Sequence, residues 1–383
     1  MTIERYNPGN AVRPASYSQA VKAGNTVYVS GQVAWDDKGK VVGRGDIAAQ
    51  TEQVMQNLKQ AVELTGGALS DVVKLTTFIT NPAYTPAVLA ARSRYFPQDP
   101  PASTLLAVNA LALPELLVEI EAVAVLSPKV RHHFNPASPP GQRPSYSQAV
   151  QADDVLYVSG QVAFGPDRRI VGPGDLLAQA EQTLANVAGA LSLAGADIRR
   201  VAMVRNFLIN PLLFPPFLET YRKHFRSPYP ANTTVMVSAL AFPELMVETE
   251  AIVSLSKDVE FIEPSWTGKP QEYTMATRIG NTLYVSGQVG RDRQGNLAGP
   301  GNIAAQVEQA FVNMGIVLNE AGVGYKDVLK LTAFLTNPAL FPQYAEGRQK
   351  YFPQDPPAST TAVVPALARP DFLVEVEAIA VVP

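Results

Sequence analysis

Apolar residues in the first third of the chain follow a two-residue period, then a helical one, and then both again. Two β-rich runs flank Gly24-Asn25, a pair typical of a tight hairpin turn. Behind Asp46, apolar residues recur with the spacing of one helical face, which predicts an amphipathic helix. Asn81-Pro82 ends a later strand, because proline cannot donate to a β-ladder. The predicted order is ββαβαββ: strands at 17–23 and 26–33, a helix at 46–65, a strand at 72–80, a helix from 85 to before Pro97, and strands at 104–108 and 116–126.

The last predicted strand carries acidic side chains at alternate positions. In Val118-Glu119-Ile120-Glu121, a two-residue period places both glutamates on one face of the sheet and both aliphatic residues on the other. The helices need an apolar sheet face to cover, so we expect them on the Val/Ile side. The unit is therefore predicted to be an α+β domain whose opposite sheet face presents carboxylates.

This unit occurs three times. Ser-Gly-Gln-Val at 30–33 returns at 159–162 and 286–289, and the paired glutamates return with the same spacing. Insertions inside a strand are poorly tolerated, because a one-residue shift turns every side chain to the other face. We therefore predict three tandem ββαβαββ domains, held by short links as an intramolecular pseudo-trimer, at residues 1–127, 128–256 and 257–383.

Composition narrows the classes of function. The 383 residues are 46% hydrophobic and 17% charged, as in an ordinary folded protein with room for three cores. A net charge of −3 without a basic cluster argues against a nucleic-acid partner. We find no membrane-spanning stretch and no signal peptide, and we expect a cytoplasmic protein. Because the chain has no cysteine, disulfides, thiolate catalysis and Cys-ligated metals are excluded.

Histidine and serine residues predict no further chemistry. All three histidines, His132, His133 and His224, belong to the second copy. No histidine therefore recurs as the base for a serine nucleophile at Ser103 or Ser359. Zinc prefers three or four suitable ligands, so we predict no metal site.

Several motifs together resemble the reactive intermediate deaminase (Rid, also YjgF-like) family, over essentially the whole chain, three times. The matching segments in the first copy are Tyr17-Ser18-Gln19-Ala20, Ser30-Gly31-Gln32, Gly43 to Gln50, Pro101-Ala102-Ser103-Thr104 and Val118-Glu119-Ile120-Glu121-Ala122. The resemblance implies a chorismate-mutase-like α+β fold with a central β-barrel, helices outside and three clefts between neighbouring units. One chain would supply all three units and act as a monomer. The implied activity is hydrolysis of imines and enamines, small metabolites, without a cofactor.

The resemblance also implies site residues in each cleft. It implies a tyrosine, a glycine whose backbone approaches the ligand, and a glutamate that positions or activates water: Tyr17, Tyr146 and Tyr273; Gly31, Gly160 and Gly287; Glu119, Glu248 and Glu375. A carboxyl in a partly desolvated cleft can have a raised pKa and act as a general acid or base. The structural alternatives are tyrosines that pack the core, glycines at β-bulges, and acids that serve only the barrel face.

An arginine that the resemblance leads us to expect is missing. Family members hold a substrate carboxylate with an arginine after a Pro-Ala pair, and Ser103, Asn232 and Ser359 occupy these positions here. These three residues are the candidate substrate-binding positions. Arg205, in the place of Thr76 and Thr332, could be a replacement cation, but we expect it on the surface. Arg291 could likewise be a replacement cation, and we likewise expect it on the surface.

Two functions from different classes follow. The first is an atypical Rid-like enzyme whose interdomain clefts hydrolyse or tautomerise a small imine, enamine or carbonyl compound. The second is a non-catalytic protein that binds or senses a metabolite, which the absent arginine favours. A scaffold or chaperone-like role is a third possibility.

Overall fold

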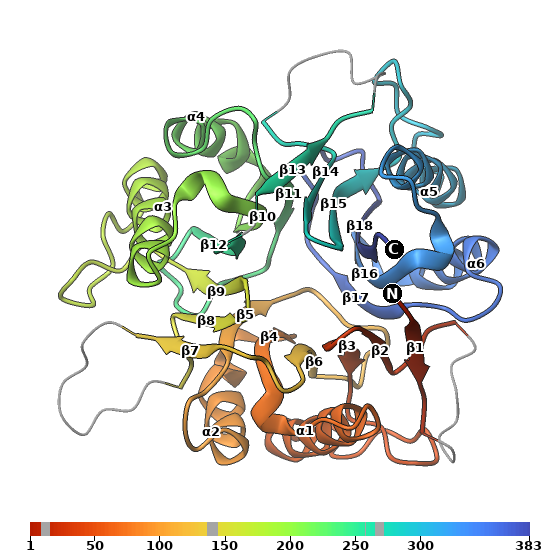
Figure 1. Ribbon diagram of the computed structural model, residues 1–383, viewed down its shortest axis with the longest axis horizontal. Coiled ribbons are helices and arrows are strands. Elements are labelled where there is room, and N and C mark those ends of the chain that lie inside the picture. Colours follow the sequence, from red (N-terminus) through yellow and green to blue (C-terminus); the bar gives the residue numbers. More distant parts are fainter. Residues whose placement is uncertain (9–15, 136–144, 257, 265–271) are drawn as a thin grey trace.

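A computed structural model describes residues 1–8, 16–135, 145–256, 258–264 and 272–383, and it shows three sheets around one axis with the helices outside (Figure 1). The first repeat, in red and orange, lies beside the second, in yellow and green, and the third, in cyan and blue (Figure 1). The predicted α+β class is confirmed.

Each repeat contains the predicted elements and one additional strand at its start. The first repeat consists of β1 (Ile3–Tyr6), β2 (Ala20–Ala23), β3 (Thr26–Gln32), α1 (Ile47–Glu63), β4 (Val72–Ile79), α2 (Thr85–Tyr95), β5 (Ala102–Ala107) and β6 (Val118–Val125). The second consists of β7 (Arg131–Phe134), β8 (Ala149–Ala152), β9 (Val155–Gln161), α3 (Leu176–Leu193), β10 (Val201–Leu208), α4 (Phe214–His224), β11 (Ala231–Met236) and β12 (Val247–Ser254). The third consists of β13 (Val259–Ile262), β14 (Ala276–Ile279), β15 (Thr282–Val289), α5 (Ile303–Glu320), β16 (Val328–Leu335), α6 (Phe341–Tyr351), β17 (Ala358–Val363) and β18 (Val374–Val381).

The long helix of each repeat is fixed at its start and along its length. In the first repeat the Asp46 carboxylate accepts hydrogen bonds from the backbone amides of Ala48 and Ala49, as an N-cap should. Val54, Leu58 and Val62 are fully buried against the sheet. The helices therefore cover the aliphatic side of the sheet, and the glutamates of β6 lie on the opposite side, as the alternation predicted.

The strand order within the first sheet is β1-β2-β3-β6-β4-β5, and the other two sheets repeat it. Only the β4–β5 pair is parallel in this sheet among the described residues. Neighbouring sheets meet at isolated bridges, two for each pair of repeats among the described residues. One set pairs Ala102 with Ser147, Ala231 with Thr274, and Ala358 with Ser18; the other pairs Ala107 with Ala239, Val235 with Leu367, and Ala110 with Val363. The third repeat thus returns to the first and closes the ring, and the barrel consists of three sheets joined by isolated bridges rather than by continuous ladders.

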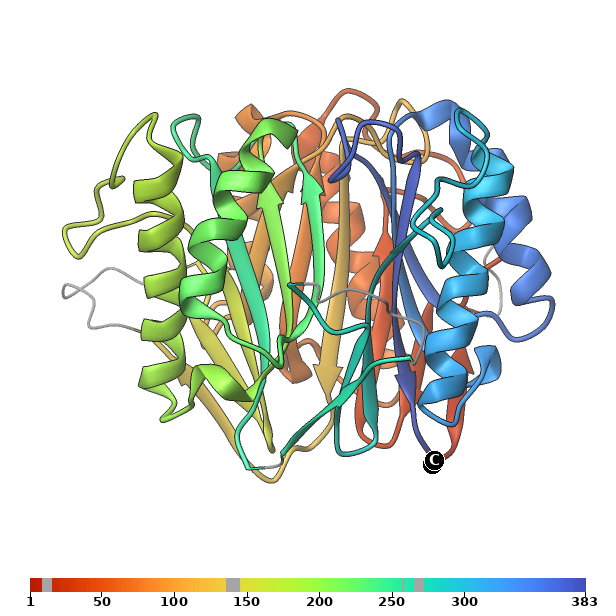
Figure 2. The ribbon, with the colours of Figure 1, turned by 90° about the horizontal axis from the view of Figure 1, so that it is seen from above.

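The strands run along the axis of the ring (Figure 2), and buried side chains fill the space between the sheets in layers. Phe78, Phe207 and Phe334 pack together in one buried cluster. A charged layer comes next along the strands, followed by three buried tyrosines, Tyr28, Tyr157 and Tyr284. Each layer takes one set of side chains from every repeat, so the interior is a core shared by the whole chain.

The charged layer departs from threefold symmetry. Lys74 Nζ lies 2.7 Å from Glu250 Oε2, and Lys330 Nζ lies 2.8 Å from Glu121 Oε2. The second repeat has Met203 in the place of these lysines.

Arg205, two residues after Met203, supplies the positive charge that a lysine supplies in the other two repeats. Its guanidinium lies 2.8 Å from Glu250 Oε1 and also pairs with Glu377. The expectation that Arg205 lies on the surface is therefore wrong, because its side chain is 9% exposed and paired on both sides.

None of the described helices is long and apolar enough to cross a membrane.

Candidate functional site

The parallel edge strand of each repeat meets the Ser-Gly-Gln segment of the next, at the three places where clefts were predicted. Between the third and first repeats, the Gly31 amide donates to Thr360 Oγ1 at 2.9 Å. In return, the Ser359 amide donates to Ser30 Oγ at 2.8 Å. Strand β17 is therefore held against β3 by reciprocal bonds that use residues of the predicted site.

The other two clefts repeat this contact with one difference. Between the first and second repeats, Gly160 donates to Thr104 Oγ1 at 3.0 Å, and Ser103 donates to Ser159 Oγ at 2.7 Å. Between the second and third repeats, Asn232 donates to Ser286 Oγ at 2.9 Å. Here the hydroxyl of Thr233, which corresponds to Thr104, has no hydrogen-bond partner among the residues that the structure describes. This contact therefore lacks the threonine bond, whereas Thr277 Oγ1 donates to the carbonyl of Ala202 at 2.7 Å between the same two repeats.

The repeated glycine makes room for the repeated glutamate. A Cβ added to Gly31 would lie 1.7 Å from Glu119 Oε1, and the corresponding distances are 1.7 Å for Gly160 and Glu248 and 1.9 Å for Gly287 and Glu375. No side chain fits at such a distance, so each glutamate carboxyl packs directly over the glycine backbone. The structure brings these two predicted residues together in every cleft.

Burial makes these glutamates unusual acids. It raises the pKa of Glu119, Glu248 and Glu375 to about 8 in each case. The neighbouring acid on the same strand adds to the effect, whereas Lys330 opposes it at Glu119. A carboxyl with such a pKa is largely neutral at pH 7 and can donate a proton.

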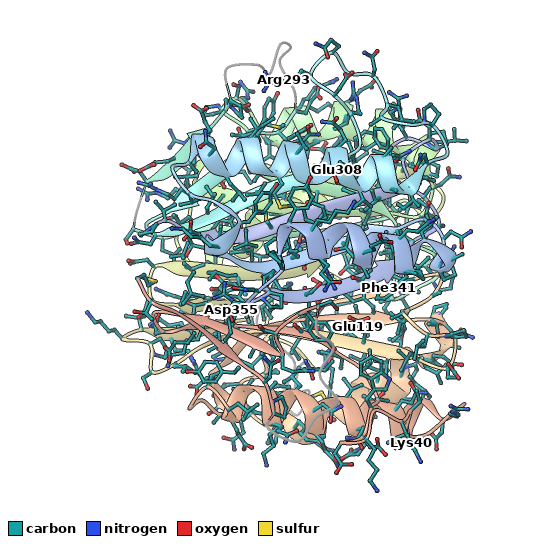
Figure 3. The ribbon with its side chains drawn as sticks, turned by 90° about the vertical axis from the view of Figure 1, so that its right-hand side faces the viewer. Lys40, Glu119, Arg293, Glu308, Phe341 and Asp355 are labelled. Atoms are coloured by element: carbon teal, nitrogen blue, oxygen red, sulfur yellow. The ribbon has the colours of Figure 1, made fainter. Side chains whose placement is uncertain are left out.

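The predicted tyrosines lie beside these carboxyls. Burial, and then the charge of Glu375, raises the pKa of Tyr273 to about 12. The pKa of Tyr17 is raised for the same two reasons, through Glu119. The pKa of Tyr146 is raised by desolvation of its phenol and by the charge of Glu248, although 40% of the residue is exposed. All three phenols are therefore neutral hydrogen-bond donors near a protonated acid. Glu119 is labelled in Figure 3, where the first repeat meets the third.

Two buried arginines were not predicted. Arg348 of α6 is 3% exposed, and its Nη1 donates to Ser359 Oγ at 2.6 Å. Arg92, at the same position of α2, is 2% exposed and donates to Thr77 Oγ1 at 3.3 Å, and burial lowers its pKa to about 10. Within the described part of the chain, neither guanidinium has a carboxylate partner.

The second repeat differs at this position, because Tyr221 replaces the arginine. Aligning the second helices of the three repeats would have revealed Arg92 and Arg348 as a shared feature. Their contacts with Thr77 and Ser359 could not be read from that alignment.

The cleft between the second and third repeats contains a cavity of about 660 Å³. Tyr273, Gly287 and Glu375 line it from the third repeat, and Asn232 lines it from the second. Four predicted site residues from two repeats therefore face one volume, which is large enough for a small organic molecule.

The described residues contain no cluster of three or more acidic or histidine side chains that could hold a metal ion.

A ring of α+β units with acid-lined clefts between them is the class of protein that these features define. Comparison with known proteins gives the family: all three repeats match the family model described as Endoribonuclease L-PSP, at residues 9–126, 137–255 and 268–382. The chain belongs to this family, and the Rid resemblance is confirmed.

Curated relatives are single units. A 3-aminoacrylate deaminase RutC from Acinetobacter baylyi is 40% identical over 110 residues, which are 29% of this chain and 86% of that protein. A 2-iminobutanoate/2-iminopropanoate deaminase from Dermatophagoides farinae is 37% identical over 110 residues, 29% of this chain and 85% of its own length. Each therefore corresponds to about one repeat.

A solved structure resembles the larger assembly. The crystal structure of a chorismatase covers 81% of this chain and 93% of its own, with a TM-score of 0.54 and 15% sequence identity. At this identity the likeness concerns the fold alone.

Proposed function

We propose that the chain hydrolyses or tautomerises a small imine, enamine or carbonyl metabolite in the clefts between its repeats. The observation that carries this proposal is the cavity that Asn232, Tyr273, Gly287 and Glu375 line together. Two relatives whose names specify deamination of 3-aminoacrylate and of 2-imino acids support the class of substrate.

The chemistry follows from a neutral acid beside a neutral phenol. The Glu375 carboxyl gives its proton to the carbon end of an enamine, which becomes an iminium ion. The resulting carboxylate then takes a proton from the water that attacks the iminium carbon. In the carbinolamine formed in this way, the hydroxyl proton moves to the nitrogen through Glu375, ammonia leaves and a carbonyl compound remains, and Tyr273 donates a hydrogen bond to the oxygen of the forming carbonyl. In this scheme Glu375 moves the protons, and Asn232 contributes polar contacts to the bound molecule.

Ser103, Asn232 and Ser359 are proposed as substrate contacts in their respective clefts. In the cleft between the third and first repeats, Arg348 donates to Ser359 Oγ, so a guanidinium reaches this position from α6 rather than from the strand. This cation supports a role for the cleft in holding a substrate carboxylate.

The test is ammonia release from 2-aminoacrylate, generated in the assay, by the full chain. We expect Glu119→Gln/Glu248→Gln/Glu375→Gln to lower the rate by roughly 100-fold or more, the usual contribution of a positioned general acid, and Glu375→Gln alone to remove the share of its own cleft. Glu63→Gln, on the exposed end of α1, is the matched control and should change nothing. No rate above that of buffer, or an unchanged rate in Glu375→Gln, would refute the proposal for this cleft, and the same substitution at Glu119 and Glu248 tests the other two.

A non-catalytic binding or sensing role is the second candidate. Ser103, Asn232 and Ser359 favour it, because none of them can copy the two-pronged grip of an arginine on a carboxylate. A ligand that raises the melting temperature and is recovered unchanged after incubation would support this role over catalysis.

A further inference from the structure

Two positions that line the cavity in the third repeat change together from repeat to repeat. One follows the Ser-Gly-Gln-Val segment, and the other lies in the loop before the last strand. They are Trp35 and Leu113 in the first repeat, Phe164 and Phe242 in the second, and Arg291 and Arg369 in the third. In the second repeat the two rings meet edge to face, with centroids 5.6 Å apart, so the two positions face each other. An apolar pair has thus become a pair of arginines in the third repeat alone.

Both arginines line the 660 Å³ cavity between the second and third repeats. Arg293 lines it too, at a position where the other repeats have Asp37 and Pro166. Figure 3 labels Arg293 at the outer edge of the third repeat. The mouth of this cavity is therefore more basic than the corresponding places in the other repeats.

The acidic residues around the cavity do not neutralise Arg291. The Asp292 carboxylate accepts hydrogen bonds from the backbone of Gln294 and Asn296, at 2.9 and 2.8 Å, and so closes its own loop. Glu272 pairs with Arg222.

Arg369 and Arg291 differ in their present partners. Arg369 pairs with the half-buried Asp371. In the described ranges, the Arg291 guanidinium donates only to the carbonyl of Gly295, at 3.2 Å, and has no carboxylate partner. The Arg291 guanidinium therefore has N–H donors that can bind an anionic ligand.

The backbone and side chains at the mouth are held in place. The Asn313 side chain of α5 donates to the carbonyl of Arg291 at 2.8 Å, and it also donates to that of Val289 at 3.1 Å. The Arg369 guanidinium lies over the Phe372 ring, 5.2 Å from its centroid. Such support lowers the entropy lost when a ligand binds.

Apolar and polar side chains both line the cavity. The apolar ones include Phe214 and Leu218 of α4, with Met275 and Phe372, and the polar ones include Asn232. A ligand with an apolar body and a charged end can contact both the apolar side chains and the arginines.

We propose that this cavity takes an amphipathic organic anion, whose carboxylate or phosphate is bound by Arg291 and Arg369 at the mouth and whose body reaches toward Glu375. Two planar guanidinium groups suit an oxyanion with several acceptor oxygens. The proposal rests on the proposed function for the identity of the reacting end, and its binding step can be measured without turnover. The proposal assigns the cleft between the second and third repeats a different class of substrate from the other two clefts.

The experiment is calorimetric titration of the full chain with benzoate, phenyl phosphate and neutral benzamide at low salt. We expect at least one anion to bind roughly 10-fold or more tightly than benzamide. The double variant Arg291→Phe/Arg369→Phe, which copies the second repeat, should weaken that anion by roughly 10- to 100-fold. Arg199→Ala, an exposed arginine paired only with Asp197 two residues away, is the control and should bind as the original chain does. Arg291→Gln/Arg369→Gln provides the same test if the phenylalanine variant does not fold.

Comparing the affinities for benzoate and phenyl phosphate shows whether the site prefers a carboxylate or a phosphate. Equal affinity for benzamide and both anions, no binding of any probe, or anion binding that survives both double variants would overturn the proposal. Ammonia release is measured on the same preparations, so the two failures are separable. Arginine-dependent anion binding without any turnover refutes only the proposed reaction, and turnover with arginine-independent binding refutes only this inference.

Discussion

Replacing Arg205 by methionine should lower the free energy of unfolding by about 3 to 4 kcal/mol at pH 7. Burial opposes a charge at this position, yet Glu377 and Glu250 raise the pKa of Arg205 above its ordinary value. The substitution keeps an apolar stem in the core and removes the charge. Glu250 then retains Lys74, at 2.7 Å, whereas Glu377, 2% exposed at its side chain, loses the cation that it contacts.

The size of the expected loss follows from the free energy of protonating a carboxylate that has lost its cation. An unpaired buried carboxylate takes up a proton, and protonating a glutamate of ordinary pKa, about 4.3, at pH 7 costs about 3.7 kcal/mol, since the gap of about 2.7 pH units counts about 1.36 kcal/mol each. The uncompensated charge can therefore lower the free energy of unfolding by at most about 3.7 kcal/mol, because protonation is the alternative. This value agrees with the range of about 3 to 5 kcal/mol for breaking a buried ion pair.

The pH dependence has a definite sign. Lowering the pH also protonates glutamates in the unfolded chain, so neutralising the carboxylate that has lost its cation then costs less free energy. The penalty should therefore fall by about 1.4 kcal/mol for each pH unit below pH 7 and nearly vanish near the unfolded pKa of about 4.3.

Urea unfolding at pH 7 and pH 4.5, followed by circular dichroism and by tryptophan fluorescence, measures the effect. Coincident transitions are needed before a single free energy is assigned to three interlocked repeats. Met203→Lys combined with Arg205→Thr restores the pattern of the other repeats and should recover most of the loss. Arg199→Met is the surface control. A penalty under about 1 kcal/mol at pH 7, or one that is equal at both pH values, would refute the role assigned to the guanidinium.

Three further outcomes are expected. Gly31→Ala should lower the melting temperature, because its Cβ would lie 1.7 Å from Glu119 Oε1, and Gly31→Ala/Glu119→Ala should regain most of the loss; a stable single variant would contradict the packing argument. The folded pKa values of Glu119, Glu248 and Glu375, about 8, exceed the unfolded ones, so stability present at acidic pH should decline as the pH rises to 8. Urea midpoints between pH 5 and 8.5 measure this decline, and changing all three glutamates to glutamine should flatten it. Light scattering should find one 41.1 kDa chain per particle, and particles of three chains would count against the closed ring.

The element order could be predicted because each signal was local. Alternation in Val118-Glu119-Ile120-Glu121 placed the acids opposite the helices, and Asp46 marked the start of α1. Strand β1 was missed, since its four residues, Ile3–Tyr6, form an edge strand too short to show a period. The boundaries of the three predicted domains stay a prediction.

The electrostatics of the site could not be predicted in the same way. Arg205 was expected on the surface, because its neighbours along the chain give no sign of Glu250 on β12 and Glu377 on β18. Arg348 appeared as one more polar residue of a helix, and only the packing of α6 on β17 brings it to Ser359. The sequence showed that a glycine and a glutamate recur in every repeat. It did not show that the glutamate carboxyl packs on the glycine backbone.

The charged layer requires three unlike units in one ring. One arginine that contacts two carboxylates from different repeats cannot be built in a ring of three identical polypeptides, where the same change would bring three arginines to the axis and remove every lysine. Because all three units are on one chain, Met203 and Arg205 always meet the same two neighbours. Separated from them, the second unit would carry a charge pattern suited only to its two unlike neighbours, and three copies of it would not form an equivalent core.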